Sequence, residues 1–160
     1  MLDFLFKTLW GKILTTFFIS MVPVIELRGA IPWATGMGLK PAVAIAVAMV
    51  GNLIPIPFII LFIKKIFAWM RGVSPKLNSV VDRMEAKAEK NKEKVLKYAF
   101  WGLALFVAIP LPGTGAWTGA LVAAMLDMPL KKALPSIVIG VVGAGLVVAF
   151  VSYGAAALFF

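Results

Sequence analysis

Four apolar stretches constrain this chain more than any other feature, and they cover residues 13–25, 41–63, 98–109 and 133–160. Runs such as AVAIAVAMV are apolar on every side of a helix, so they leave no polar face to meet water. The chain is 62% hydrophobic, with a mean hydropathy of +0.99, which exceeds the range of soluble domains. We therefore predict an integral membrane protein with one all-α domain, because helices satisfy their own backbone groups in lipid.

The lengths of these stretches predict the architecture. A helix needs about 20 residues to cross the hydrocarbon core of a bilayer, and residues 41–66 and 131–158 are long enough. The other two stretches are shorter, and each ends at residues that break a helix. We predict that 13–39 and 98–128 form re-entrant hairpins, which return to the side they enter. Full crossings, giving four spans, are the alternative.

The same order of elements occurs twice along the chain: a short arm, a break, a second arm, a proline and a full-length helix. Two such repeats with interrupted helices are typical of transporters built from inverted halves. Aligning Gly29 with Gly115 places Arg28 over Thr114, although few residues are identical. We predict two inverted repeats. The alternative is a coincidence of two proline-broken helices, since membrane helices tolerate proline and glycine.

Positive charge is concentrated between the two repeats. Of the 16 basic residues, 10 lie within 64–97, and the net charge is +9. Such segments stay in the cytoplasm and attract anionic lipid headgroups. We therefore predict a multi-pass protein of the cell membrane with 64–97 in the cytoplasm. We expect no nucleic-acid partner, because no aromatic residue lies among the charges of 74–97 to stack on bases.

Residues 74–97 predict a charged cytoplasmic helix, with Ser74 as its cap and Pro75 at its first position. Apolar and small residues spaced three and four apart form a seam along it, namely Leu77, Val81, Met84, Ala88, Asn91 and Val95. The seam could pair with a second copy of the chain. We favour a helix that lies on the inner leaflet. Residues 1–12 predict a shorter interfacial helix.

The motif PVIELRGAIP, residues 23–32, places Glu26 and Arg28 between two apolar runs. An isolated charge is costly there, so these residues are candidates for function. The guanidinium of Arg28 fits a phosphate or carboxylate group. Burial favours the protonated form of Glu26 and a nearby arginine favours its ionised form, so Glu26 could exchange a proton. A purely structural ion pair is the alternative.

A second motif, PLPGTGAWTGAL, follows the third apolar stretch. Gly113 and Gly115 free the backbone to turn, and the Thr114 hydroxyl and the start of a helix near Ala116 could face an anion. Close helix packing at Gly115 and Gly119 is an equally good explanation. In the full-length helix before the charged segment, Asn52 could line the same cavity or make one interhelical hydrogen bond.

The candidate substrate- or ion-binding residues are therefore Glu26, Arg28, Gly29, Asn52, Pro112, Gly113, Thr114 and Gly115. The chain has no cysteine and no histidine, and its sequence contains no paired carboxylates and no nucleophile beside a base. We therefore expect no catalytic residues, no metal and no cofactor, and we do not predict an enzyme.

PVIELRGAIP and PLPGTGAWTGAL together resemble the putative small multidrug export protein family, and the resemblance covers nearly the whole chain. That family is distantly similar to the DedA or VTT membrane proteins, which are associated with paired re-entrant hairpins and with moving polyprenyl phosphate or phospholipid. The resemblance implies that Glu26, Arg28 and Gly29 form the motif of the first hairpin and residues 112–115 that of the second. This chain is shorter than DedA proteins and has no charge in the second motif.

Taken together, these patterns predict a small proton-coupled secondary transporter. It would move an anionic or amphipathic substrate, either a lipid phosphate or an exported small molecule, through a midplane site between the two hairpins. We expect a homodimer in contact with membrane lipids, because two full spans per chain enclose little space. The alternatives are an uncoupled phospholipid or polyprenyl-phosphate translocase, and a structural or assembly protein that docks a partner through 74–97.

The absence of native cysteine allows a direct test of the topology. Single cysteines replacing Leu2 and Phe160 should both react with a membrane-impermeant thiol reagent in intact cells, because re-entrant hairpins leave both termini outside. A cysteine replacing Asn91 should stay unlabelled. If neither terminus reacts until the cells are opened, the broken segments cross the membrane and the inverted repeat is wrong.

Overall fold

The computed structural model describes residues 8–159 except 97–98 and 112. The described residues form α-helices and their connections, without any strand, which confirms the all-α prediction. The chain divides into two compact units. Unit 1 contains the residues up to Pro55 and those from Val141 onward, and unit 2 contains Ile56–Gly140.

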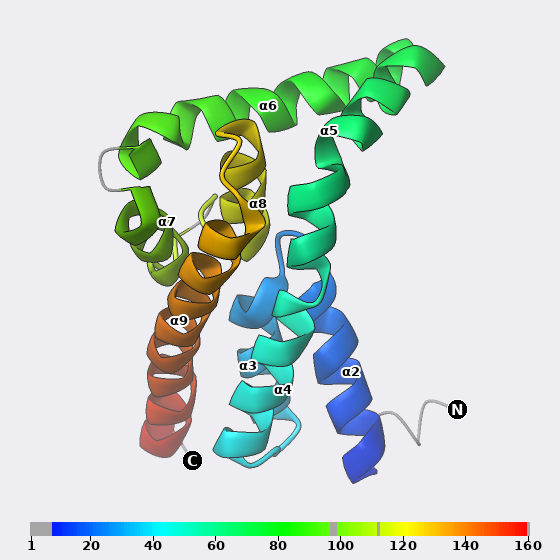
Figure 1. Cartoon of the computed structure of the whole chain (residues 1–160). Helices are drawn as coiled ribbons and strands as arrows, with labels where there is room; N and C mark the ends of the chain where they lie inside the picture. Colours follow the sequence, from blue (N-terminus) through cyan, green and yellow to red (C-terminus); the bar gives the residue numbers. More distant parts are fainter. Residues whose placement is uncertain (1–7, 97–98, 112, 160) are drawn as a thin grey trace. The chain divides into compact units, whose positions relative to one another are not determined.

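Unit 1 is built around a helical hairpin. Helices α2 (Leu9–Met21) and α3 (Glu26–Gly36) lie side by side in opposite directions, and both pack on α4 (Pro41–Leu53) (Figure 1). The hydroxyl of Thr8 caps α2 by accepting a hydrogen bond from the backbone N–H of Gly11, at 3.1 Å. The broken first segment is therefore two short helices joined by a four-residue turn.

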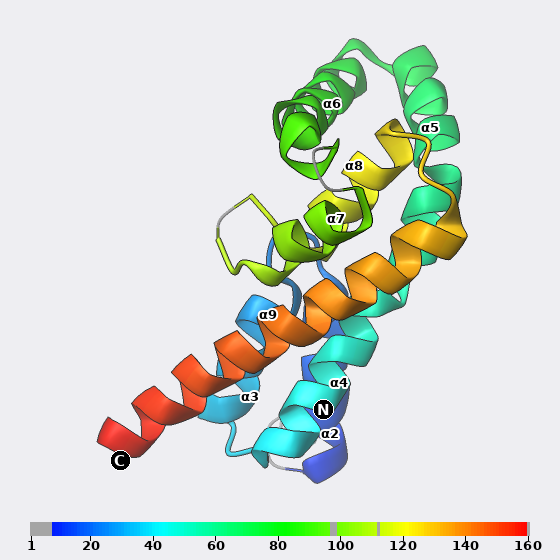
Figure 2. The ribbon, with the colours of Figure 1, turned by 60° about the vertical axis from the view of Figure 1, so that its left-hand side comes forward.

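Unit 2 contains the second hairpin. It comprises α5 (Pro55–Val73) from its second residue, α6 (Pro75–Leu96), α7 (Ala99–Ala108), α8 (Ala116–Met125) and the first third of α9 (Leu130–Phe159). Helices α7 and α8 pack on each other, and α6 lies across both of them, as Figures 1 and 2 show. The second broken segment is thus also a pair of short helices.

The second arms of the two hairpins end with the same backbone hydrogen bonds. After α3, Gly38 adopts a left-handed conformation (φ +72°), and the next N–H donates to the Ala34 carbonyl at 3.0 Å. After α8, Asp127 does the same (φ +52°), and the next N–H donates to the Ala123 carbonyl at 2.9 Å. This is a common way to satisfy the last carbonyls of a helix. The predicted repeat of elements is present, whereas the inverted relation of its halves stays a prediction.

These helix ends also correct the expected alignment of the two halves. Equivalent positions lie 89 residues apart (38 and 127, 34 and 123), which places Arg28 opposite Trp117 and not opposite Thr114. The reason is that the second turn, residues 109–115, is longer than the first, residues 22–25. Proline and glycine positions alone do not reveal that difference in turn length.

The observed boundaries differ from the expected ones at two places. The helix expected over 41–66 has a turn at Ile54, before Pro55, and then continues to Val73. Residues 9–12, expected in a separate interfacial helix, are the first turn of α2, and residues 1–7 lie outside the described part. Helices α6 and α9 match their expected ranges to within one residue.

Part of the seam of α6 packs inside its own chain. Val81, the second residue of the seam, is fully buried, and α6 contacts α7 and α8 of the same chain. Val81 is therefore available neither to a second copy nor to the leaflet. The side chains of Ala88, Asn91 and Val95 lie outside what the structure describes.

Gly51 provides a test of packing in unit 1. A Cβ at this position would meet the Ser20 hydroxyl and lie 2.5 Å from the Phe17 carbonyl oxygen, whereas a Cβ at Gly36 would meet nothing within 4 Å. Gly51→Ala should therefore lower the free energy of unfolding by about 1–3 kcal/mol. Gly36→Ala, the matched control, should change it by less than about 1 kcal/mol, in the stabilising direction.

Thermal unfolding midpoints of the two variants and the wild type in one detergent would measure the difference. Equal midpoints for the Gly51 and Gly36 variants would contradict the close approach of α2 and α4.

Candidate functional site

The turn of the first hairpin has an unusual backbone. Val24 and Glu26 both have positive φ angles, +76° and +50°, although neither is glycine. A β-branched residue such as valine is rarely found there, and each such residue typically costs about 1–3 kcal/mol. Val24 is also 90% exposed, so its own burial does not offset the cost. Backbone conformations of this kind are concentrated at functional sites.

Glu26 begins α3 and is only 4% exposed. Its backbone N–H donates to the Val22 carbonyl at 3.0 Å, which closes the turn, and the positive end of the helix dipole favours a carboxylate at this position. Arg28 is half-buried two residues later, and its charge interacts with that of Glu26. The structure thus places the two predicted site residues within electrostatic range at the start of one helix.

Asn52 lies in α4 of the same unit and is 1% exposed. Within the part of the chain that the structure describes, neither its Nδ2 nor its Oδ1 atom has a hydrogen-bond partner. The alternative explanation of Asn52, a single interhelical hydrogen bond, is therefore wrong as far as the described residues are concerned, because none of them bonds to the amide. Buried polar atoms are nearly always bonded, so an unbonded amide inside a membrane protein marks a position where a ligand can bind.

Two further buried hydroxyl groups, which the sequence did not single out, lie on α2, the helix that packs on α4. Thr16 donates to the Lys12 carbonyl at 2.8 Å, and Ser20 donates to the Phe17 carbonyl at 2.7 Å. Their protons are used within α2, but their oxygen lone pairs can still accept. The spacing of four residues between them puts both on one face of α2, and this pattern in the sequence could have identified them.

The turn of the second hairpin is closed by its own residues. Gly113 and Gly115 have φ angles of +89° and +125°, which L side chains rarely adopt, so glycine is needed at both positions. The Thr114 hydroxyl donates within the loop, to the Ile109 and Leu111 carbonyls at 2.7 and 2.8 Å. The Thr114 proton is therefore already bonded within the loop. The sequence had suggested that this hydroxyl faces a ligand. Pro112 lies outside the described residues.

Close packing explains part of the second motif. A Cβ at Gly119 would lie 2.6 Å from a methyl group of Val107 and 3.5 Å from one of Leu103, both on α7. This supports the packing interpretation of Gly119. Gly115 precedes the first residue of α8 without a side-chain cap, so the first N–H groups of α8 depend on other partners.

The candidate residues fall into two groups. Glu26, Arg28, Gly29 and Asn52 belong to unit 1, and residues 113–115 belong to unit 2. The structure therefore assembles the polar residues of the first group within one compact unit. That both hairpin turns share one site stays a prediction.

Two spans among the described residues are long and apolar enough to cross a membrane, namely Pro41–Val73 and Leu130–Gly154. Their length and composition fit an α-helical membrane protein. A comparison with protein families matches residues 26–147 to the family described as "Putative small multi-drug export protein". The chain belongs to this family, as its motifs predicted.

No curated protein and no solved structure matches the chain. The similarity to DedA or VTT proteins stays a prediction.

Asn52→Leu tests whether the buried amide is unbonded. Leucine has the same branched shape, and an unbonded buried amide costs about 1–3 kcal/mol, so the variant should unfold at the same temperature as the wild type or higher. Ser136→Ala is the contrast, because the buried Ser136 hydroxyl donates to the Phe100 carbonyl, and its loss should cost about 1 kcal/mol.

Thermal unfolding in detergent measures both effects. If Asn52→Leu lowers the midpoint as much as Ser136→Ala does, the amide of Asn52 makes hydrogen bonds that hold the fold together.

Proposed function

We propose that this protein is a small secondary transporter of the cell membrane that moves an anionic or amphipathic substrate and is coupled to protons. One observation supports this most directly. A buried carboxylate and a half-buried guanidinium start the same helix, in a unit that also contains a buried amide with no hydrogen-bond partner among the described residues. Buried ionisable groups in membrane proteins mark substrate and ion pathways.

Arg28 is the group that we assign to the substrate. A guanidinium presents several N–H donors in one plane, which matches the oxygens of a phosphate or carboxylate. Its half-burial reduces competition from water and leaves one side accessible. The substrate class is therefore a lipid phosphate or an amphipathic acid. Asn52 can add one donor and one acceptor to an uncharged part of the substrate.

Glu26 is the group that we assign to the proton. Burial favours its neutral form, while Arg28 and the start of α3 favour its ionised form. An anion bound at Arg28 offsets the influence of the guanidinium on Glu26, so binding of substrate changes the proton affinity of Glu26. Such mutual dependence is what ion coupling requires.

Membership of an export family supports transport, and the charge distribution supports a topology. Residues 64–97 carry most of the basic residues, so we place them in the cytoplasm. The two long apolar spans found among the described residues leave little protein to enclose a path, which favours a homodimer. Re-entrant hairpins that bring their turns together at the midplane complete the proposal.

Substitutions at the first hairpin test the proposal in proteoliposomes, with a fluorescent short-chain phosphatidic acid as the anionic probe. Arg28→Ala should abolish its movement, and Arg28→Lys should restore only part of it, because lysine lacks the planar array of donors. Glu26→Gln should remove the dependence on a pH gradient. Lys40→Ala, which removes an exposed charge from the same unit, should transport like the wild type.

Each contrary outcome identifies another function. Movement that depends on Arg28 but not on a pH gradient, even in the wild type, indicates an uncoupled lipid translocase. If Arg28→Ala stays folded by size-exclusion chromatography and keeps full activity in cells, while a variant with glutamine at the exposed residues Arg83 and Lys90 of α6 stays folded and loses it, the protein is a docking or assembly protein.

A further inference from the structure

We propose that one face of α6 binds the headgroups of anionic phospholipids. This face consists of Lys76, Arg83, Lys87 and Lys90, and we call it the basic row. The inference is independent of the proposed transport site, because it concerns a different surface, in unit 2.

The basic row follows from the helical period. At 3.6 residues per turn, positions 76, 83, 87 and 90 fall within a sector of about 60° around the helix axis. All four side chains are exposed, and no acidic residue of the described part of α6 lies in this sector. The row spans about 21 Å along the helix, at about 1.5 Å per residue. It is therefore long enough to contact several headgroups at once.

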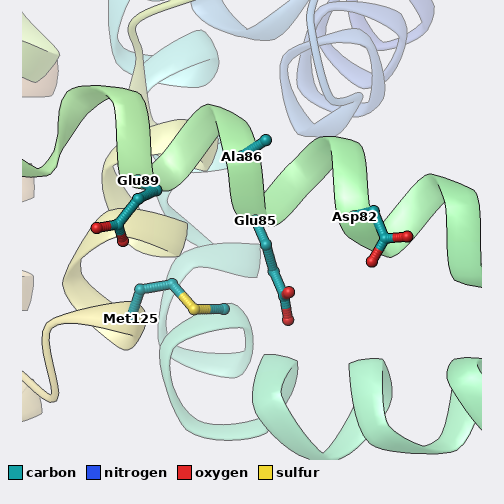
Figure 3. A pocket seen from close by; sticks show the side chains of 5 residues that line it. All are labelled: Asp82, Glu85, Ala86, Glu89 and Met125. Carbon is teal, nitrogen blue, oxygen red and sulfur yellow. The ribbon is translucent and has the colours of Figure 1, made fainter.

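The acidic residues of α6 lie on a different face. Asp82, Glu85 and Glu89 line a cavity of about 450 Å³ together with Met125 of α8, and Figure 3 shows their side chains on one side of α6. Asp82 and Glu85 are paired with Arg71 of α5, at 2.8 and 2.7 Å. Asp82 and Glu89 are exposed, but these carboxylates lie on a different face of α6 from the row, and Arg71 partly neutralises two of them. They therefore offset little of the positive charge on the row.

The apolar seam of α6 lies between these two faces, and its second residue, Val81, is fully buried. Contacts with α7 and α8 hold α6 in place. The row therefore is not the polar side of a helix that inserts its apolar side into lipid. Its contribution to binding is electrostatic, which calls for a partner with a dense negative charge.

The position of α6 in the chain favours a membrane surface over an acidic protein. Only Ser74 separates α6 from α5, which ends a span long enough to cross a bilayer. Trp69 near the end of α5 and Trp101 near the start of α7 are each 66% exposed. Exposed tryptophans are typical of the membrane–water interface, so both ends of α6 adjoin helices with an interfacial residue.

The row also contacts the second hairpin. The Cε atom of Lys87 lies 3.6 Å from the position that a Cβ would take at Gly113. A phosphate held by the ammonium group of Lys87 would therefore lie beside the turn at residues 113–115. This contact supplies, from another helix, the positive charge that the second motif lacks in its own sequence.

A lipid titration of the purified full chain in detergent tests the proposal, with dihexanoyl phosphatidylglycerol as the anionic probe and dihexanoyl phosphatidylcholine as the neutral one. Tryptophan fluorescence, from Trp69 and Trp101 among others, reports binding. The wild type should bind the anionic lipid more tightly, and the preference should fall as salt is added. Replacing all four residues of the row by glutamine should weaken its binding about tenfold or more, since each basic residue contributes.

The matched control replaces four exposed lysines outside α6 by glutamine, namely Lys40, Lys65, Lys131 and Lys132. It has the same net charge as the row variant and should keep wild-type affinity. An equal loss in both variants would show a general effect of net charge and would overturn the proposal. Wild-type affinity in the row variant would also overturn it and would leave an acidic protein as the occupant of the row.

The double variant Arg83→Gln with Lys90→Gln should lose an intermediate amount of affinity for the anionic lipid. It removes only two charges, so it tests the proposal if the fourfold variant does not fold. Transport of the phosphatidic acid probe by Arg28→Ala distinguishes the two proposals. Loss of that transport with retained binding of phosphatidylglycerol supports both of them.

Discussion

The structure depends on one constraint, that the backbone must satisfy its own hydrogen bonds where no water is present. Each unpaired group in a bilayer costs several kcal/mol, so every break in a helix needs local partners. The first hairpin closes its turn with backbone bonds from Val22 to Ile19 and from Glu26 to Val22. The second, longer turn uses the Thr114 hydroxyl for the same purpose. The positive φ angles at Val24, Gly113 and Gly115 occur in these tight closures.

This constraint also explains where polar side chains occur. Once a helix is broken inside an apolar segment, its new end provides a local charge, and a residue such as Glu26 is less costly there than in mid-helix. Where the backbones of two helices approach closely, no room is left for a further hydrogen-bond partner beside a buried polar side chain. Gly51 brings α4 against α2, and the neighbouring Asn52 is buried without a hydrogen bond among the described residues. The same small residue that stabilises the packing thus helps to create the polar site.

The charged side chains of α6 are arranged differently, because acidic and basic residues lie on different faces of the helix. The acidic side chains Asp82 and Glu85 pair with α5, Val81 of the seam is buried, and the basic row remains exposed. A single helix can therefore hold unit 2 together and still present a uniform charge to its surroundings. The contact of Lys87 with the turn at Gly113 links this surface to the second hairpin.

The sequence by itself determined the class of protein, the two broken segments, the arms of the second hairpin and the capped helix α6. These follow from hydropathy, segment length, proline and glycine, which act within a few residues of one another. It also identified Glu26 and Arg28, because charges between apolar runs are conspicuous. Only the tertiary structure decided that Asn52 has no hydrogen-bond partner among the described residues and that Val81 of the α6 seam is buried by its own chain. It also decided that Lys87 reaches Gly113 and that the second turn shifts the repeat to 89 residues. Each of these depends on which surfaces meet between helices distant in the chain, and local sequence rules carry no information about that packing.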